Sequence, residues 1–60
     1  MEITEALAIE LTKKYIKGGE LPIDWNRSNG GAVVLMSDNR ILYFNRVEVE
    51  HARLMIGEKK

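Results

Sequence analysis

The chain has 60 residues and no cysteine, and its nine basic residues balance its nine acidic ones. The absence of cysteine excludes disulfides and thiolate metal sites, and this length supports only one small hydrophobic core. The balanced charge argues against a domain built to hold nucleic acid, because such domains gain much of their affinity from an excess of basic residues. We therefore expect one domain over residues 1–60, near the lower size limit for folding alone.

The first predicted element is a helix over residues 3–17, a stretch without glycine or proline. Its glutamates come early and its lysines late, which is the order that complements the helix dipole. An apolar stripe recurs along it at helical spacing and consists of Ile3, Leu7, Ala8, Leu11 and Tyr15. Gly18 and Gly19 are expected to end the helix.

Residues 18–31 are predicted to form a long connection. Connections of this length in small domains are usually functional or mobile. Apolar residues alternate along residues 21–25, which indicates an extended segment or a short edge strand, since an edge strand tolerates the proline found there. Residues 29–31, Asn-Gly-Gly, are typical of a turn.

Residues 32–45 contain two apolar runs joined by a polar turn and are predicted to form a β-hairpin. If Asp38 and Asn39 are a two-residue turn, alternate side chains fall on opposite faces. One face then carries Val33, Leu35, Leu42 and Phe44, and the other carries Val34, Met36, Ile41 and Tyr43. Antiparallel pairs normally keep one face polar. The sequence therefore predicts a partner for the second face, unless the helices cover one face each.

A second helix is predicted over residues 46–56. Asn45 and Glu48 have the spacing of a capping box at a helix start, with Asn in place of Ser or Thr. The alternating valines and glutamates also allow a rival interpretation, in which the second strand continues through residues 46–50. Residues 57–60 begin with glycine and are expected to be a solvated tail.

These elements predict the α+β class, as a single small domain in the order helix, long loop, β-hairpin, helix (αββα). No apolar stretch of the sequence is long enough for a transmembrane helix. The N-terminus is acidic where a signal peptide is basic. We expect a cytoplasmic protein with no membrane partner.

No residue pattern names a reaction, a cofactor or a metal, so we predict a protein that is not an enzyme. His51 is the only histidine. We expect it at the edge of the core, because a general base also needs a positioned partner and a pocket. Glu48 and His51 share the Glu-x-x-His spacing of di-iron helices, but such a centre needs a second element of this kind and further glutamates.

The predicted function is a protein-interaction module whose partner is a larger protein or a second copy of this chain. Tryptophan and arginine often dominate binding interfaces, although Trp25 alternatively folds back to cap the core. The predicted partner-binding residues are Trp25, Arg27, Val34, Met36, Ile41 and Tyr43. Two alternatives remain: a structural homodimer, and a nucleic-acid-associated regulator that uses the exposed lysines of residues 13–17. The neutral net charge of the chain argues against the second alternative.

In length and character the chain resembles the small proteins with which phages and other mobile elements block host defences, anti-CRISPR proteins among them. The resemblance rests on the size and style of the whole chain and on no motif. It implies an inhibitor that binds and blocks a larger protein. Because those proteins share no common fold, it assigns no role to any residue.

Overall fold

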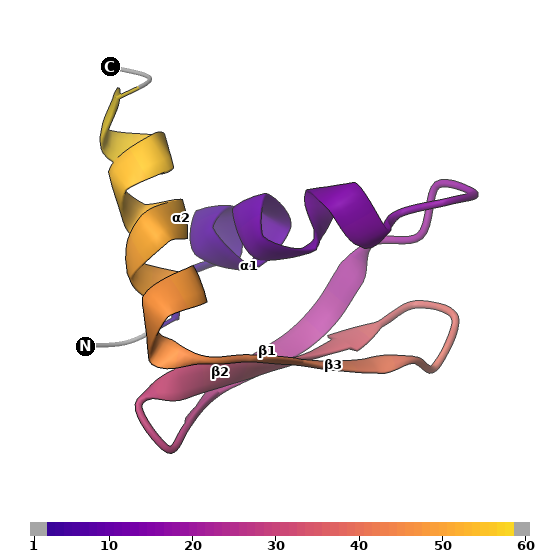
Figure 1. Ribbon diagram of the computed structural model, residues 1–60. Helices are drawn as coiled ribbons and strands as arrows, with labels where there is room; N and C mark the ends of the chain where they lie inside the picture. Colours follow the sequence, from indigo (N-terminus) through magenta and orange to yellow (C-terminus); the bar gives the residue numbers. More distant parts are fainter. Residues whose placement is uncertain (1–2, 59–60) are drawn as a thin grey trace.

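The computed structural model describes residues 3–58 as a three-stranded antiparallel sheet with two helices on one of its faces (Figure 1). Its elements are α1 (Glu5–Thr12), a 3-10 turn η1 (Lys13–Tyr15), β1 (Pro22–Ser28), β2 (Gly31–Met36), β3 (Ile41–Phe44) and α2 (Arg46–Glu58). The strands lie in the order β1-β2-β3, which makes a meander. The predicted α+β class is confirmed.

Half of the predicted long loop, residues 22–28, forms β1, so the short edge strand that the alternation over residues 21–25 indicates is present and is longer than expected. This strand pairs with β2 and has a bulge between Pro22 and Asp24. A proline and a bulge are both typical of an edge strand, since each disturbs pairing with further chains. Asn29 and Gly30 join the two strands with positive φ angles of 50° and 83°, the geometry of a two-residue type I′ turn.

The turn between β2 and β3 has three residues, where the sequence predicts two. The N–H of Asn39 donates to the carbonyl of Met36 at 2.9 Å, and the N–H of Met36 donates to the carbonyl of Arg40 at 2.8 Å. Asn39 has a φ of 71°, so the loop is a turn followed by a left-handed residue, a common three-residue hairpin. The resulting pairs are Ala32↔Phe44, Val33↔Tyr43, Val34↔Leu42 and Leu35↔Ile41. The predicted register is therefore wrong by one residue.

One hydrophobic core lies between the helices and the sheet. Its buried members are Leu7, Ala8, Leu11, Ala32, Val34, Met36, Phe44, Val49 and Ala52. The predicted stripe of the first helix is confirmed, because Ile3 and Tyr15 also pack against this cluster. Thr12 is buried beside them, and its hydroxyl donates to the carbonyl of Ala8 at 2.9 Å. Its polar group is thus satisfied without water.

The first helix is shorter than predicted at both ends. The Oγ1 atom of Thr4 accepts a hydrogen bond from the N–H of Leu7 at 3.2 Å, so Thr4 caps a helix that begins at Glu5. The α-helix ends at Thr12 and tightens into η1, which ends at Tyr15. The glycines at 18 and 19 therefore lie in the following loop and do not end the helix.

The capping box of the second helix is confirmed. The N–H of Glu48 donates to Oδ1 of Asn45 at 2.8 Å, and the N–H of Asn45 donates to Oε1 of Glu48 at 2.9 Å. The rival strand over residues 46–50 is therefore wrong. The helix continues through Gly57 to Glu58, beyond its predicted end, so residues 57 and 58 do not belong to the expected tail. Residues 59–60 lie outside the described part of the chain.

Arg40 connects the β2–β3 turn to the end of η1. Its Nε donates to Oδ2 of Asp38 at 2.6 Å, and its Nη2 donates to the carbonyl of Tyr15 at 3.1 Å. The Tyr15 carbonyl is one of the acceptors that a helix end leaves unpaired. The same Nη2 lies 3.4 Å from Oε1 of Glu20. One guanidinium thus joins three segments of the chain.

Glu20 closes the loop after η1. Its carboxylate accepts hydrogen bonds from the backbone N–H groups of Lys17 and Gly18, both at 2.9 Å. These bonds lower the pKa of Glu20, with the bond from Lys17 as the largest cause and the charge of Arg40 as a smaller one. Hydrogen bonds to a carboxylate favour its charged form.

The lowered pKa predicts a pH-dependent effect of Glu20→Gln. A carboxyl whose pKa falls on folding stabilises the protein above the ordinary glutamate pKa, and this contribution disappears as pH falls through the lowered value. Urea unfolding at several pH values should show wild type more stable at neutral pH and the difference closing in acid. Glu50→Gln, which removes an exposed ion pair with Arg46, should change stability less. A difference for Glu20→Gln that stays constant with pH would contradict the assignment.

Two glycine-to-alanine substitutions should act in opposite directions. A β-carbon at Gly31 would overlap the carbonyl oxygen of Phe44, whereas one at Gly57 would meet nothing within 4 Å. Gly31→Ala should therefore destabilise the fold by about 1–3 kcal/mol or more. Gly57→Ala should stabilise α2 by up to about 1 kcal/mol. Thermal or urea unfolding measures both, and equal effects would argue against the close approach of β2 and the β3–α2 junction.

Candidate functional site: the open face of the sheet

The face of the sheet opposite the helices carries the side chains of Val33, Leu35, Ile41 and Tyr43. The register pairs Val33 with Tyr43 and Leu35 with Ile41. No described element covers this face (Figure 1). Ile41 remains 54% exposed and Tyr43 remains 74% exposed. Since antiparallel sheets usually place polar residues on the solvent side, this apolar surface, here named the open face, is the candidate site.

Strand β1 gives the open face a polar margin. Asp24 lies opposite Leu35, and Asn26 lies opposite Val33. These four residues and Ile41 line a shallow hollow of about 160 Å³. An apolar centre beside polar groups is the arrangement of many protein–protein interfaces.

The predicted common face of Val34, Met36, Ile41 and Tyr43 is wrong. Val34 and Met36 are 0% exposed and belong to the core, so they are not available to a partner in the folded protein. The cause is the three-residue turn, because a shift of one residue moves each side chain of β3 to the other side relative to β2. Ile41 and Tyr43 are exposed, and their partner-binding role stays a prediction.

Trp25 and Arg27 lie on the helix side of β1, away from the open face. Trp25 is opposite Val34 and packs, half-buried, against the core, which matches the alternative that it caps the core. Arg27 is exposed and lines a pocket of about 240 Å³ with Arg46 and Arg53. The Nε atom of Arg53 is buried and has no hydrogen-bond partner in the described structure.

Sequence reasoning missed Val33 and Leu35 as members of the site. Each is a direct neighbour in β2 of Val34 or Met36, which were predicted to be exposed. The wrong β2–β3 register alone therefore explains the error. The signal that identifies them is Asn39, because asparagine adopts the left-handed conformation more readily than most residues. A left-handed residue at this place favours the three-residue loop.

Within residues 3–57, no three histidine, aspartate or glutamate side chains are placed to hold a metal ion together. No helix in the same range is long and apolar enough to cross a membrane. His51 lies exposed on α2, and Glu48 belongs to the capping box. In the Glu-x-x-His pair, Glu48 therefore serves to cap the start of α2.

No protein-family model matches this sequence, and neither a curated protein nor a solved structure shows a match to it. Function is therefore inferred from the surface of this chain.

Substituting glutamate on the two sides of the sheet should give very different stabilities. Met36→Glu places an unpaired charge in the core and should unfold the domain, at a cost of several kcal/mol. Tyr43→Glu leaves its charge in water and should cost about 1 kcal/mol or less, mainly through lower strand propensity. Circular dichroism with urea unfolding measures both variants. Similar losses of stability would show that the two side chains share a face after all.

Proposed function

We propose that this protein is a non-enzymatic interaction module that binds a larger protein through the open face of its sheet. The observation that carries the proposal is an uncovered apolar surface made by Val33, Leu35, Ile41 and Tyr43. Contiguous exposed apolar patches on small soluble domains often mark interaction sites. Tyrosine is also one of the residue types that contribute most to binding energy.

The size and rigidity of the open face support this role. A standard interface buries roughly 800 Å² on each partner, which is about a fifth of the 4358 Å² surface of this chain. A contact of this size on this chain therefore has to include the margins of the open face on β1 and β3. Because the side chains are held on paired strands, little conformational freedom is lost on binding.

The narrower form of the proposal is an inhibitor that occupies the surface of its target in the cytoplasm. The resemblance in size and character to phage-encoded anti-CRISPR proteins supports this form. A small domain with a single exposed apolar sheet face needs no further device to block a larger protein, because occupying a surface is enough. No residue role is transferred from those proteins.

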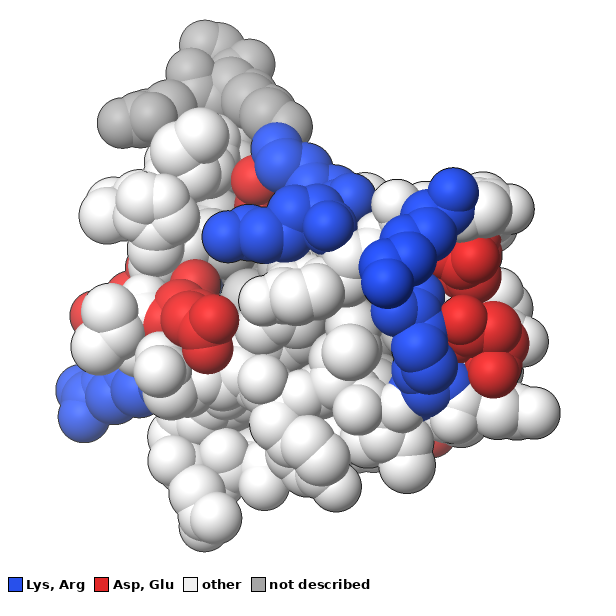
Figure 2. Space-filling view, turned by 45° about the vertical axis from the view of Figure 1, so that its right-hand side comes forward, with Lys and Arg blue, Asp and Glu red and all other residues white. Residues whose placement is uncertain are grey.

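A second copy of the chain is the alternative partner, and the edge position of β3 favours it over nucleic acid. Strand β3 has four residues and is an edge strand of the sheet. A second copy can therefore pair with this edge or pack against the open face. The nucleic-acid alternative has less support. Figure 2 shows acidic groups beside the basic ones, and Lys13 is already paired with Glu10 at 2.8 Å.

Affinity capture with three forms of the protein tests the proposal. A partner bound by wild type should lose at least about tenfold in affinity with Tyr43→Glu, as expected for an aromatic residue at the centre of an interface. Leu54→Glu is the matched control, since Leu54 is 66% exposed on α2 and lies away from the sheet. A partner that still binds Tyr43→Glu, or that Leu54→Glu removes equally, would contradict the role of the open face.

Light scattering over a wide concentration range distinguishes the two partners. We expect the purified protein to be monomeric, with its open face available. A stable dimer that Tyr43→Glu converts to monomers would assign the open face to a second copy.

A further inference from the structure

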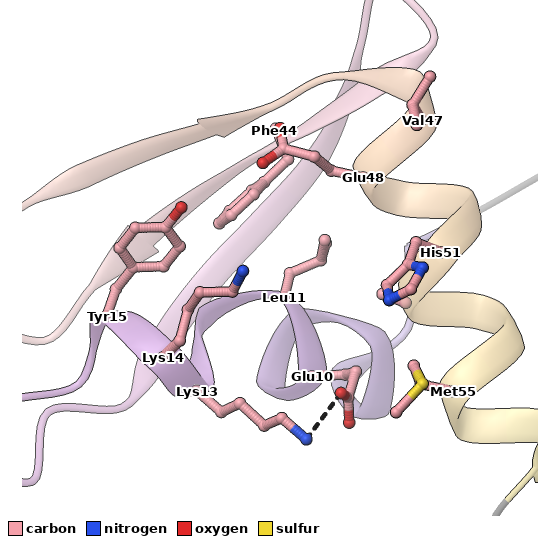
Figure 3. A pocket seen from close by; sticks show the side chains of 11 residues that line it. Glu10, Leu11, Lys13, Lys14, Tyr15, Phe44, Val47, Glu48, His51 and Met55 are labelled. Carbon is pink, nitrogen blue, oxygen red and sulfur yellow. Dashed lines mark ion pairs between the residues drawn. The ribbon is translucent and has the colours of Figure 1, made fainter.

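A recess lies on the helix side of the molecule, between α1 with η1 on one side and β3 and α2 on the other (Figure 3). Its volume is about 370 Å³, within the range of roughly 300–1,000 Å³ that is usual for small-molecule sites. The apolar part of its lining includes Leu11, Phe44 and Ala52, all buried, and the half-buried Tyr15 and Met55.

The walls of the recess are held in place before any ligand arrives. The rings of Tyr15 and Phe44 meet edge to face, with centroids 5.8 Å apart. The carbonyl of Tyr15 is bonded to Arg40, and the carboxylate of Glu48 is held by the backbone of Asn45. A preformed site loses little conformational entropy on binding, which favours affinity.

One cationic group at the recess has no partner. The Lys14 side chain reaches across the apolar lining from η1 (Figure 3). Its ammonium forms no ion pair or hydrogen bond with any residue from 3 to 57, whereas the neighbouring Lys13 is paired with Glu10. His51 faces the same space from α2 and offers a further hydrogen-bonding group.

We propose that this recess binds a small carboxylic acid with an apolar body, such as a medium-chain fatty acid. The carboxylate pairs with the Lys14 ammonium, and the apolar body packs against Leu11, Phe44 and Met55. Because the recess and the open face lie on opposite sides of the sheet, the site is independent of the proposed interaction surface.

Glu48 is the acidic group that opposes such a ligand, since Glu10 is neutralised by Lys13. Its carboxylate lies beside Phe44, at the junction of β3 and α2 (Figure 3), so its charge repels a ligand carboxylate from that end of the recess. Removing that charge should therefore strengthen binding. Glu48→Gln does so while keeping the capping box, because glutamine serves at this position as well as glutamate does.

Isothermal titration calorimetry with decanoate tests the proposal. Lys14→Gln should raise the Kd about three- to fivefold, the usual effect of one partly exposed ion pair. Glu48→Gln should lower the Kd by a similar factor. Decanol, which has the same tail without the charge, should bind more weakly and respond to neither variant. Decyltrimethylammonium, a cation, should bind more weakly than decanoate.

Chemical-shift mapping locates the ligand and separates this proposal from the proposed function. Decanoate should shift the signals of Leu11, Phe44 and Met55, and Tyr43→Glu should leave its affinity unchanged. Shifts confined to Ile41 and Tyr43, a Kd that Lys14→Gln does not alter, or tighter binding of the cation would each overturn the proposal. So would the absence of decanoate binding.

Discussion

The hydrogen bonds that Met36 makes with Arg40 and with Asn39 decide which side chains of β3 share a face with Val34 and Met36. They close a three-residue turn in which Asn39 is left-handed. With that turn in place, Val34 and Met36 lie under the helices and Val33 and Leu35 lie on the open face. Burying a large apolar side chain contributes about 1.5–3 kcal/mol, so a register that exposed Val34 and Met36 would lose much of the core. Arg40 adds a second constraint, because it also binds the end of η1.

A chain of this size covers one face of its sheet and leaves the other open. Both helices lie on the same side (Figure 1), and α2 packs against α1 as well as against β2. The two candidate sites follow from this arrangement. The open face is what the helices do not cover, and the recess lies where the first helix and α2 diverge above β3. The proposed partner and the proposed ligand would therefore occupy different sides of one sheet.

Local patterns predicted the helices well and the sheet less well. The capping box of Asn45 and Glu48 and the apolar stripe of the first helix depend on residues three or four positions apart, and such spacings can be counted in a sequence. The register of β2 and β3 depends on the backbone conformation of one residue, Asn39. The two-residue and the three-residue turn can both be built from the same stretch of sequence, so composition does not distinguish them. This error alone displaced Val34 and Met36 from the core to the predicted site.

Strand β1 was predicted only in part, as an extended segment or short edge strand over residues 21–25. The alternation there is short and the strand is bulged at the same place, so this pattern alone does not predict a strand that continues to Ser28. The Asn29-Gly30 pair is a strong signal for a two-residue hairpin, and it predicts β1 only when it is considered as a link between two strands. Trp25 then falls on the helix side through its pairing with Val34.

The contact between α1 and α2 joins segments from opposite ends of the described chain. The strand meander is formed by neighbours in sequence, and such contacts form quickly. An isolated helix as short as α1 is marginal in water. During synthesis α1 is made first, yet Val49 and Ala52, which complete the core around it, are made late. The domain therefore gains its stable fold only after α2 has left the ribosome.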